Sequence, residues 1–159
     1  MKRSSKEEHR PGGFVPGTFS IAAHDPDADE FGVAVSTALV GVGALCPFVS
    51  ENAAVATQSF VKVSHGANAV DLADRGVSVP TACDALLEDD EHASYRQLHG
   101  IDGEGRTFVF SGDDCVDWNG HLERDDHTVA GNMLANGDVI EDISETFQGT
   151  EGELAERLM

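Results

Sequence analysis

A threonine stands at the start of the first predicted β-strand of the chain. Thr18 opens the segment TFSIAAHD, whose residue types predict a strand over residues 18–24. A threonine at the first position of a chain can act as an N-terminal nucleophile, because its hydroxyl attacks an amide carbonyl while its own α-amine accepts the proton. A free α-amine has a pKa of about 7.7 to 8.0, so part of it is neutral near pH 7. The predicted chemistry is hydrolysis of an amide bond.

Such a reaction also needs hydrogen-bond donors for the negative charge that develops on the carbonyl oxygen. The candidates are the backbone amides of Gly43 and Ala44 and the side chain of Asn132. The loop around Gly43 could instead be a flexible connection, and Asn132 could be a turn residue that bonds its own backbone. Gln58 could point into the cleft beside Thr18 or be a buried amide satisfied by backbone groups.

The elements that must position these residues alternate in type along the chain. The predicted strands cover residues 18–24, 31–37, 53–60, 94–101, 106–111 and 127–131, and the predicted helices cover residues 66–75, 80–88 and 138–159, the last with a break at 149–152. This order indicates an α+β fold. A chain of 159 residues can form one ordinary core, so we expect one domain over residues 18–159 behind a disordered leader of residues 1–17.

The composition is strongly acidic. The chain has 29 acidic and 10 basic residues and a formal net charge of -19. Such a surface repels phosphate groups, so we expect neither nucleic acid nor an anionic membrane as a partner. From Thr18 onward Lys62 is the only lysine, which favours a protein from a high-salt cytoplasm, where the Debye length is about 3 Å. The alternative is an acidic protein from an ordinary cytoplasm.

The localisation that the sequence predicts is cytoplasmic. The first 17 residues lack the apolar run of a signal peptide, and no stretch has the length of a membrane span. Cys46, Cys83 and Cys115 are odd in number and far apart, so they are interpreted as small buried side chains in a reducing compartment.

No cofactor or metal is predicted. Asp25, Asp27 and Asp29 alternate like the start of a calcium loop, but Glu30 and Ser36 stand where glycine and glutamate are expected. A second acidic stretch with two histidines, residues 113–127, has irregular spacing on a predicted loop. Both are interpreted as solvated acidic surface.

Several short segments occur in the order seen in a known family. They are TFSIAAHDP, FGVAV, VGALCPF, ATQSFV, YRQLHGIDGEGR, AGNML and ELAERL, together with the stretch WNGH at residues 118–121. Through these segments the chain resembles the domain-of-unknown-function family 1028, and the resemblance extends from Thr18 to Met159. That family resembles the Ntn-hydrolase-like superfamily, which implies a four-layer αββα sandwich. Relatives continue past the last helix, so the resemblance implies a sandwich shortened at its C-terminus, whose open strand edge favours a homo-oligomer.

The resemblance also implies roles for residues near Thr18. Thr37 keeps the hydroxyl that a serine supplies in relatives, although a β-branched residue suits any strand. Lys62 stands where relatives have Asp or Asn; it could lower the pKa of the α-amine or be a surface lysine. His65 stands where relatives often have Tyr, and could support substrate binding or be a hydrogen-bonded structural histidine. Ala38 replaces a frequent basic residue.

Two functions are therefore compatible with the sequence. The first is an N-terminal-nucleophile amidohydrolase that acts on a small-molecule or peptide-like amide, with Thr18 as nucleophile. The second is a non-catalytic binding or assembly module on the same fold. The leader before Thr18 separates them, because the first function needs a free α-amine at that residue.

Overall fold

Two antiparallel β-sheets form the centre of the protein. The computed structural model describes residues 17–159, so the predicted leader lies outside the described residues except for Gly17. The first sheet has the order β2-β1-β8-β7 and the second the order β3-β4-β5-β6. The strands are β1 (Thr18–Asp25), β2 (Glu30–Thr37), β3 (Pro47–Val49), β4 (Ala53–Ser59), β5 (Arg96–Asp102), β6 (Thr107–Ser111), β7 (Gly120–Glu123) and β8 (His127–Asn132).

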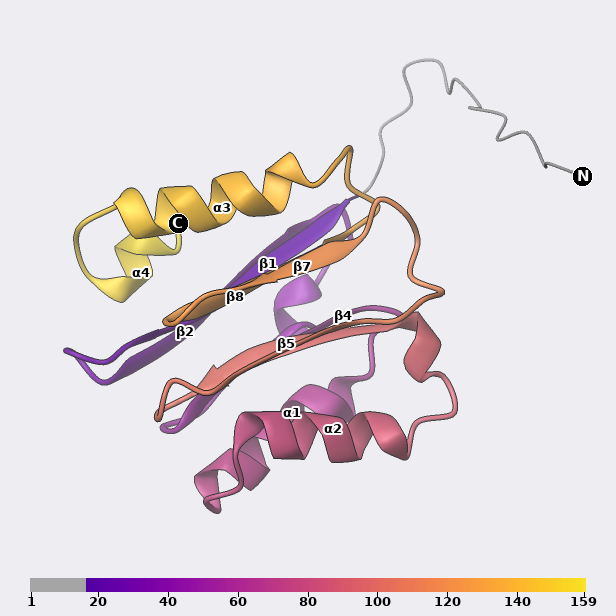
Figure 1. Cartoon of the computed structure of the whole chain (residues 1–159), viewed down its shortest axis with the longest axis horizontal. Helices are drawn as coiled ribbons and strands as arrows, with labels where there is room; N and C mark the ends of the chain where they lie inside the picture. Colours follow the sequence, from indigo (N-terminus) through magenta and orange to yellow (C-terminus); the bar gives the residue numbers. More distant parts are fainter. Residues whose placement is uncertain (1–16) are drawn as a thin grey trace, which may run out of the picture.

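Helices cover the outer faces of both sheets (Figure 1). α3 (Asp138–Gly149) and α4 (Leu154–Arg157) lie on the first sheet, and α1 (Val63–Asp74) and α2 (Val79–Glu88) lie on the second. Two short 3-10 turns lie in the connections: η1 (Val42–Ala44) between β2 and β3, and η2 (Ala93–Tyr95) between α2 and β5. The predicted α+β class is confirmed.

The β1–β2 hairpin follows from its turn chemistry. The Asp25 carboxylate accepts hydrogen bonds from the backbone amides of Asp27 and Ala28 at 3.1 and 3.2 Å, which folds the chain back on itself. Asp29 closes the turn in the left-handed region, with a φ of 54°, a conformation that aspartate tolerates better than most residues. The hairpin then pairs in register from Asp25 with Glu30 up to Thr18 with Thr37.

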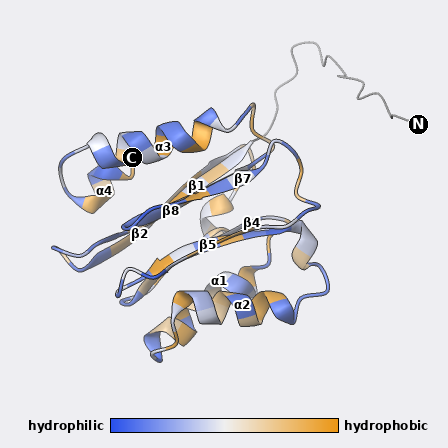
Figure 2. Cartoon of the chain, viewed as in Figure 1, coloured by the Kyte–Doolittle hydropathy of each residue, from blue (hydrophilic) through white to orange (hydrophobic). Residues whose placement is uncertain are grey.

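The helices are amphipathic and bury apolar side chains against the sheets. Ser78 caps α2 by accepting a hydrogen bond from the amide of Thr81. In α3, Ile140 and Phe147 face the first sheet, and the Arg157 guanidinium of α4 lies 4.2 Å above the Phe147 ring. Figure 2 shows hydrophilic and hydrophobic positions side by side on α1, α2 and α3.

The layer between the two sheets is apolar at one end and polar at the other. Ala22 of β1, Ala54 of β4 and Ile101 of β5 form a small apolar cluster there, with Phe31 and Val33 of β2 packed against it. Small side chains let the sheets approach closely. Toward the Thr18 end of β1 the same layer holds buried serine, threonine, glutamine, histidine and asparagine side chains.

The structure differs from the predicted elements at two strands and several boundaries. β7 lies inside the predicted loop at residues 113–127, and β3 was not predicted; each is four residues long or less, and pairing with a neighbouring strand creates it. β5 begins at Arg96, because residues 93–95 form η2. The three cysteines are buried and free, as predicted.

Two surface features bear on partners. Within residues 17–159, no helix is long and apolar enough to cross a membrane. β2 is an edge strand of the first sheet, and its outer side pairs with no strand of the described chain. The predicted homo-oligomer stays a prediction.

Gly100 in β5 provides a test of the packing between β5 and β4. A Cβ at this position would lie 2.6 Å from the backbone oxygen of Ala54, which cannot move without breaking the sheet. We expect Gly100→Ala to lower the free energy of unfolding by about 1–3 kcal/mol, measured by urea denaturation. The control is Gly43→Ala, where a Cβ meets nothing within 4 Å. Equal stability of the two variants would contradict this packing.

Candidate functional site

Thr18 lies at the end of a central strand, on the face that points toward the second sheet. Its neighbours along the first sheet are Thr37 on β2 and Asn132 on β8, each directly opposite in register. The Thr18 hydroxyl is 2.9 Å from the Thr37 hydroxyl. Gly17 packs tightly before it, since a Cβ there would be 3.1 Å from the backbone oxygen of Met133. The predicted nucleophile therefore lies between two other predicted site residues.

A side chain absent from the sequence-based prediction, Gln97 of β5, joins the two sheets at this end. Its Oε1 accepts hydrogen bonds from Gln58 Nε2 at 2.7 Å and from Asn132 Nδ2 at 3.1 Å. Its Nε2 lies within hydrogen-bond distance of Ser111 Oγ and of the backbone oxygens of Gly120 and Gly131. Gln97 is fully buried and fixes the position of the Asn132 carboxamide.

The network continues deeper between the sheets through Ser20 of β1. Ser20 Oγ donates to Gln58 Oε1 at 2.7 Å and lies 2.7 Å from His99 Nε2. His99 Nδ1 in turn lies 2.8 Å from Thr128 Oγ1. Gln58 is thus a buried amide, as one of its two interpretations held, but side chains rather than backbone groups satisfy it.

The Ser20–His99 pair has the connectivity of a nucleophile and a base, yet both side chains are buried. Ser20 is among the residues that line a cavity on the outer face of the first sheet, but its hydroxyl bonds Gln58 and His99 between the sheets. Burial lowers the pKa of His99 to about 3, with a smaller contribution from His121, so His99 is neutral and a weak base. The pair is a structural part of the inter-sheet network.

The predicted oxyanion loop is exposed beside the end of β2. Thr37 Oγ1 accepts a hydrogen bond from the Leu39 amide at 3.3 Å, which starts this loop. Within η1 the Ala44 amide already donates to the Gly41 carbonyl. Gly43 is exposed and has open space around its Cα. The Gly43 amide therefore suits an added acceptor better than the Ala44 amide.

Asn132 occupies a strand, and its side chain bonds Gln97 rather than its own backbone. A carboxamide nitrogen carries two hydrogens, so the Gln97 bond leaves one for a second acceptor. Asn132 also lines a cavity of about 550 Å³ that opens at this end of the sheets. Asn132 is thus fixed by Gln97 and is among the residues that line this cavity, although its side chain is itself buried.

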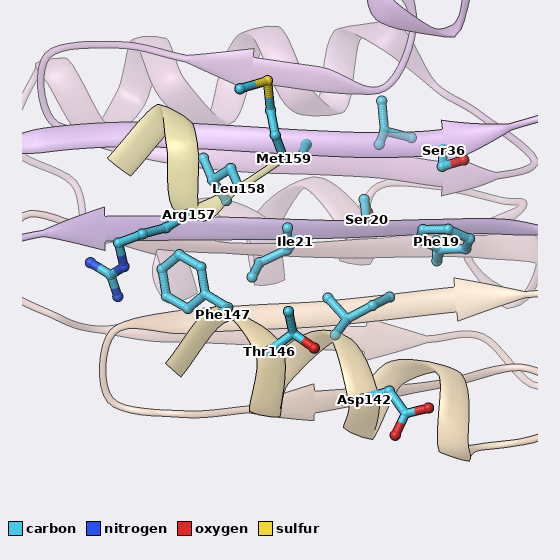
Figure 3. Close-up of a pocket in the computed structure, with 13 residues that line it drawn as sticks. Phe19, Ser20, Ile21, Ser36, Asp142, Thr146, Phe147, Arg157, Leu158 and Met159 are labelled. Carbon is cyan, nitrogen blue, oxygen red and sulfur yellow. The ribbon is translucent and has the colours of Figure 1, made fainter. Parts of the chain in front are cut away.

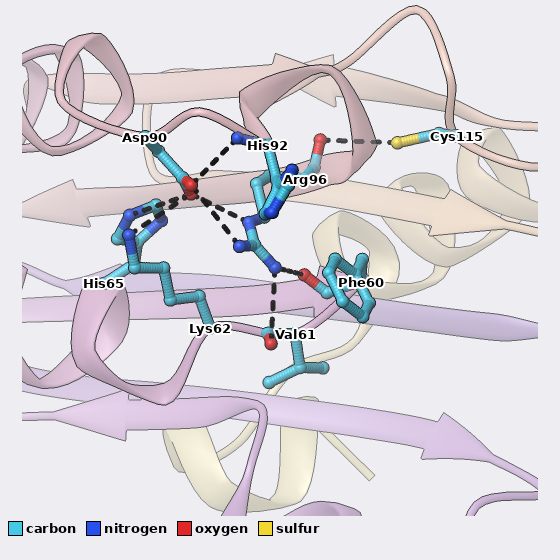
Figure 4. A network of polar contacts seen from close by, with 8 residues as sticks. All are labelled: Phe60, Val61, Lys62, His65, Asp90, His92, Arg96 and Cys115. Atoms are coloured by element: carbon cyan, nitrogen blue, oxygen red, sulfur yellow. Dashed lines mark hydrogen bonds and ion pairs between the residues drawn. The ribbon is translucent and has the colours of Figure 1, made fainter.

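Lys62 and His65 lie in a second polar network, on the helix side of the second sheet (Figure 4). Its centre is the buried carboxylate of Asp90, which pairs with Arg96 Nε at 2.8 Å and Lys62 Nζ at 3.5 Å. His65 Nε2 lies 3.3 Å from the same carboxylate. Arg96 also donates to the backbone oxygen of Phe60, and its guanidinium lies 4.7 Å from the centre of the Phe60 ring. In the described chain neither Lys62 nor His65 bonds Thr18 or Asn132.

The charges of this network are fixed by its hydrogen bonds. The Arg96 guanidinium, with help from the His92 amide and Lys62, holds the pKa of Asp90 well below its usual range. Burial and the nearby Lys62 charge lower the pKa of His65. Asp90 is therefore ionised and His65 neutral at pH 7, which makes the network a carboxylate held by two permanent cations.

The cavity beside Asn132 lies between the two networks. Its walls come from the ends of β4 and β8, from η2 and from the loop before β7, and among its lining residues are Phe60, Tyr95, Asp114, Val116, Asn132 and Met133. Thr18 is paired with Asn132 at its edge. Thr18 itself does not line the cavity, but its strand partner Asn132 does.

A second cavity, of about 680 Å³, lies on the opposite face of the first sheet (Figure 3). Phe19 and Ile21 of β1, Phe147 of α3 and Leu158 line it, with Arg157 and Asp142 as its charged residues. Phe19 points away from the inter-sheet layer that Thr18 faces, because side chains alternate along a strand. In residues 17–159 no group of three or more metal-ligating side chains occurs in either place.

The comparisons with known proteins agree with the sequence motifs. A model of a family of unknown function, DUF1028, matches residues 18–159. The chain belongs to the DUF1028 family. The crystal structure of protein SPO2555 from Silicibacter pomeroyi, a DUF1028 protein, matches with a TM-score of 0.85 and 26% identity. The match covers 89% of this chain but only 64% of that one, so this chain spans less than two thirds of that DUF1028 relative. No curated protein matches the chain.

Gln97, His99 and Ser20 are the site residues that the sequence-based prediction missed. Two of them have a signal in their strand: polar Gln97 and His99 alternate with Leu98 and Gly100 in the middle of β5. Period-two polar positions inside a buried strand indicate a face that must be hydrogen-bonded.

Gln97 provides a test of the inter-sheet network. Gln97→Leu leaves the amides of Gln58 and Asn132 without their acceptor, and an unsatisfied buried group costs about 1–3 kcal/mol. We expect a loss of at least that size in the free energy of unfolding, measured by urea denaturation. Gln148→Leu, at an exposed position in α3, is the control and should change stability little. An unchanged free energy of unfolding in Gln97→Leu would show that the network does not stabilise the fold.

His99 gives the protein a defined pH dependence. The pKa of His99 is about 3 when folded and about 6.5 when unfolded, so between these values only the unfolded chain binds the proton. The contribution of neutral His99 to the free energy of unfolding is complete above about pH 6.5. It is lost as the pH falls toward 3, with a slope of about 1.4 kcal/mol per pH unit. We expect His99→Gln to make the fall in unfolding free energy between pH 6.5 and 4 shallower by that amount.

The measurement is urea denaturation at fixed salt over this pH range. His92→Gln, which changes an exposed histidine, is the matched control and should keep the wild-type slope. The same slope in all three proteins would mean that His99 does not stay neutral when folded.

Proposed function

We propose that this DUF1028 protein is an N-terminal-nucleophile amidohydrolase that cleaves a small amide or peptide-like substrate, with Thr18 as the nucleophile. The observation that carries the proposal is the position of Thr18. It is the first residue of a central strand, its hydroxyl is held by Thr37, and its strand partner Asn132 lines a cavity. Nucleophile, donor and open space thus converge at one end of the sheets.

The arrangement of layers supports the proposal. Helices, two facing antiparallel sheets and helices are stacked in that order (Figure 1). The Ntn-hydrolase-like superfamily, which the motifs resemble, is expected to have this αββα order. In that superfamily the nucleophile begins a strand, as Thr18 does here. Proteins with the same fold can catalyse different reactions, so the proposed hydrolysis depends on the residues of the site and not on the layer order alone.

The reaction would proceed through a covalent ester. The neutral α-amine of Thr18 takes the hydroxyl proton as Oγ1 attacks the amide carbon, and Asn132 Nδ2 and the Gly43 amide donate to the oxygen that becomes negative. The C–N bond then breaks, and the leaving amine takes the proton from the Thr18 ammonium. A water molecule, deprotonated by the same amine, hydrolyses the ester and restores the Thr18 hydroxyl.

Lys62 and His65 contribute to this site through other residues. Lys62 pairs with Asp90, and the His65 ring packs 3.3 Å from the same carboxylate. Asp90 holds Arg96, and Arg96 fixes the backbone oxygen and the ring of Phe60 in the cavity wall. Their proposed part in substrate binding is therefore to position Phe60. The ring of Phe60 contacts the substrate in their place.

The position of the α-amine tests the mechanism. Three chains are prepared, beginning at Thr18, at Gly17 and at Met1, and each is assayed on a panel of aminoacyl 7-amino-4-methylcoumarin amides. We expect turnover from the chain that begins at Thr18. The single extra residue at Gly17 should lower the rate by about 10²–10⁴-fold, because it removes the base but keeps the hydroxyl.

Variants of the active form complete the test. Thr18→Ala should abolish turnover, and Thr18→Ser should retain it, since serine keeps both the hydroxyl and the amine. Intact-mass measurement of each preparation identifies its first residue. Equal rates from the chains beginning at Gly17 and Thr18, or no turnover on any panel member, would favour the non-catalytic binding module.

A further inference from the structure

Large apolar side chains that are exposed to solvent line the cavity beside Asn132. Phe60, Tyr95 and Val116 are 58%, 48% and 59% exposed, and all three line this one cavity together with Met133. Large apolar side chains that gather at a concave site, instead of being scattered singly, indicate a surface that is covered when the protein works. The walls favour an apolar side chain as the occupant.

The aromatic wall is rigid before any ligand arrives. The Phe60 and Tyr95 rings meet edge to face, with centroids 6.5 Å apart and an interplanar angle of 76°. The Arg96 guanidinium lies on the Phe60 ring, and the buried Asp90 carboxylate fixes that guanidinium from the other side, as Figure 4 shows. A wall held in this way loses little conformational entropy on binding.

Asp114 is the only carboxylate among the residues that line the cavity. No lysine or arginine lines it, and His92 is its only basic side chain. Within residues 17–159 no ion pair involves Asp114. A cationic group therefore gains a partner here, while a free carboxylate is repelled.

We propose that this cavity binds the side chain and the ammonium group of an N-terminal hydrophobic amino acid, so that the substrates are amides of such amino acids. The side chain lies against Phe60, Tyr95 and Val116, and the ammonium faces Asp114. The amide carbonyl is then directed toward Asn132 and its strand partner Thr18. This inference rests on the proposed function for the reaction, but the binding site stands on its own lining.

Binding is measured on the full chain with Thr18→Ala, which cannot turn the ligand over. The probe is L-phenylalaninamide, and the signal is the aromatic NMR resonances of Tyr95, the only tyrosine of the chain. We expect saturable shifts of these resonances. L-Alaninamide, which lacks the ring, should bind at least about tenfold more weakly, and N-acetyl-L-phenylalaninamide, which lacks the charge, about 2–5-fold more weakly.

Two substitutions that change the net charge equally test the role of Asp114. Asp114→Asn should remove the preference for L-phenylalaninamide over its N-acetyl form, and Asp113→Asn, at a neighbour outside the cavity, should keep it. Unshifted Tyr95 resonances, equal affinity for L-alaninamide, or equal effects of the two substitutions would overturn the inference.

The two proposals fail in different ways. If L-phenylalaninamide binds as expected and the chain that begins at Thr18 is inactive, the proposed binding site is supported and the proposed amidohydrolase is contradicted. If that chain hydrolyses amides without preference for a hydrophobic first residue, and Tyr95 does not respond, the nucleophile stands and this cavity is not its substrate site.

Discussion

The carboxamide of Gln97 is the contact on which this end of the molecule depends. A polar side chain between two sheets is tolerated only when its groups are hydrogen-bonded, and Gln97 uses both ends of its amide to satisfy that condition. It reaches Gln58 in its own sheet and Asn132 in the other. The place of Asn132 is thereby set by this side chain, which is one of several contacts that hold the two sheets together.

β5 connects Gln97 to the wall of the cavity. Arg96 and Gln97 are consecutive residues and point to opposite faces of the second sheet, one toward Asp90 and the helices, the other toward the first sheet. The Asp90 network on the helix side of the second sheet and the Gln97 network between the sheets are therefore connected through two adjacent residues of β5. A change in the register of β5 would displace Phe60 and Asn132 together. The rigid wall and the donor of the proposed site have a common support.

The sequence predicted what local periodicity and turn chemistry determine. The β1–β2 hairpin, α1 and α2 could be located because their patterns are complete within the segment itself. β3 and β7 could not, because strands this short owe their existence to the neighbour with which they pair. Thr18 and Asn132 could be named as candidates from their types, but their adjacency is a property of strand order. Gln97 and His99 carried a readable signal in the alternation of β5.

Gly17 shows how packing can imitate a functional signature. A glycine just before Thr18 invites an interpretation as a processing site, yet any larger residue would press on the Met133 carbonyl, whose position is fixed by the end of β8. Packing alone therefore favours glycine at this position, whether or not the bond after it is ever cut. In a comparison of homologous sequences, an invariant glycine here would be evidence about volume and none about maturation.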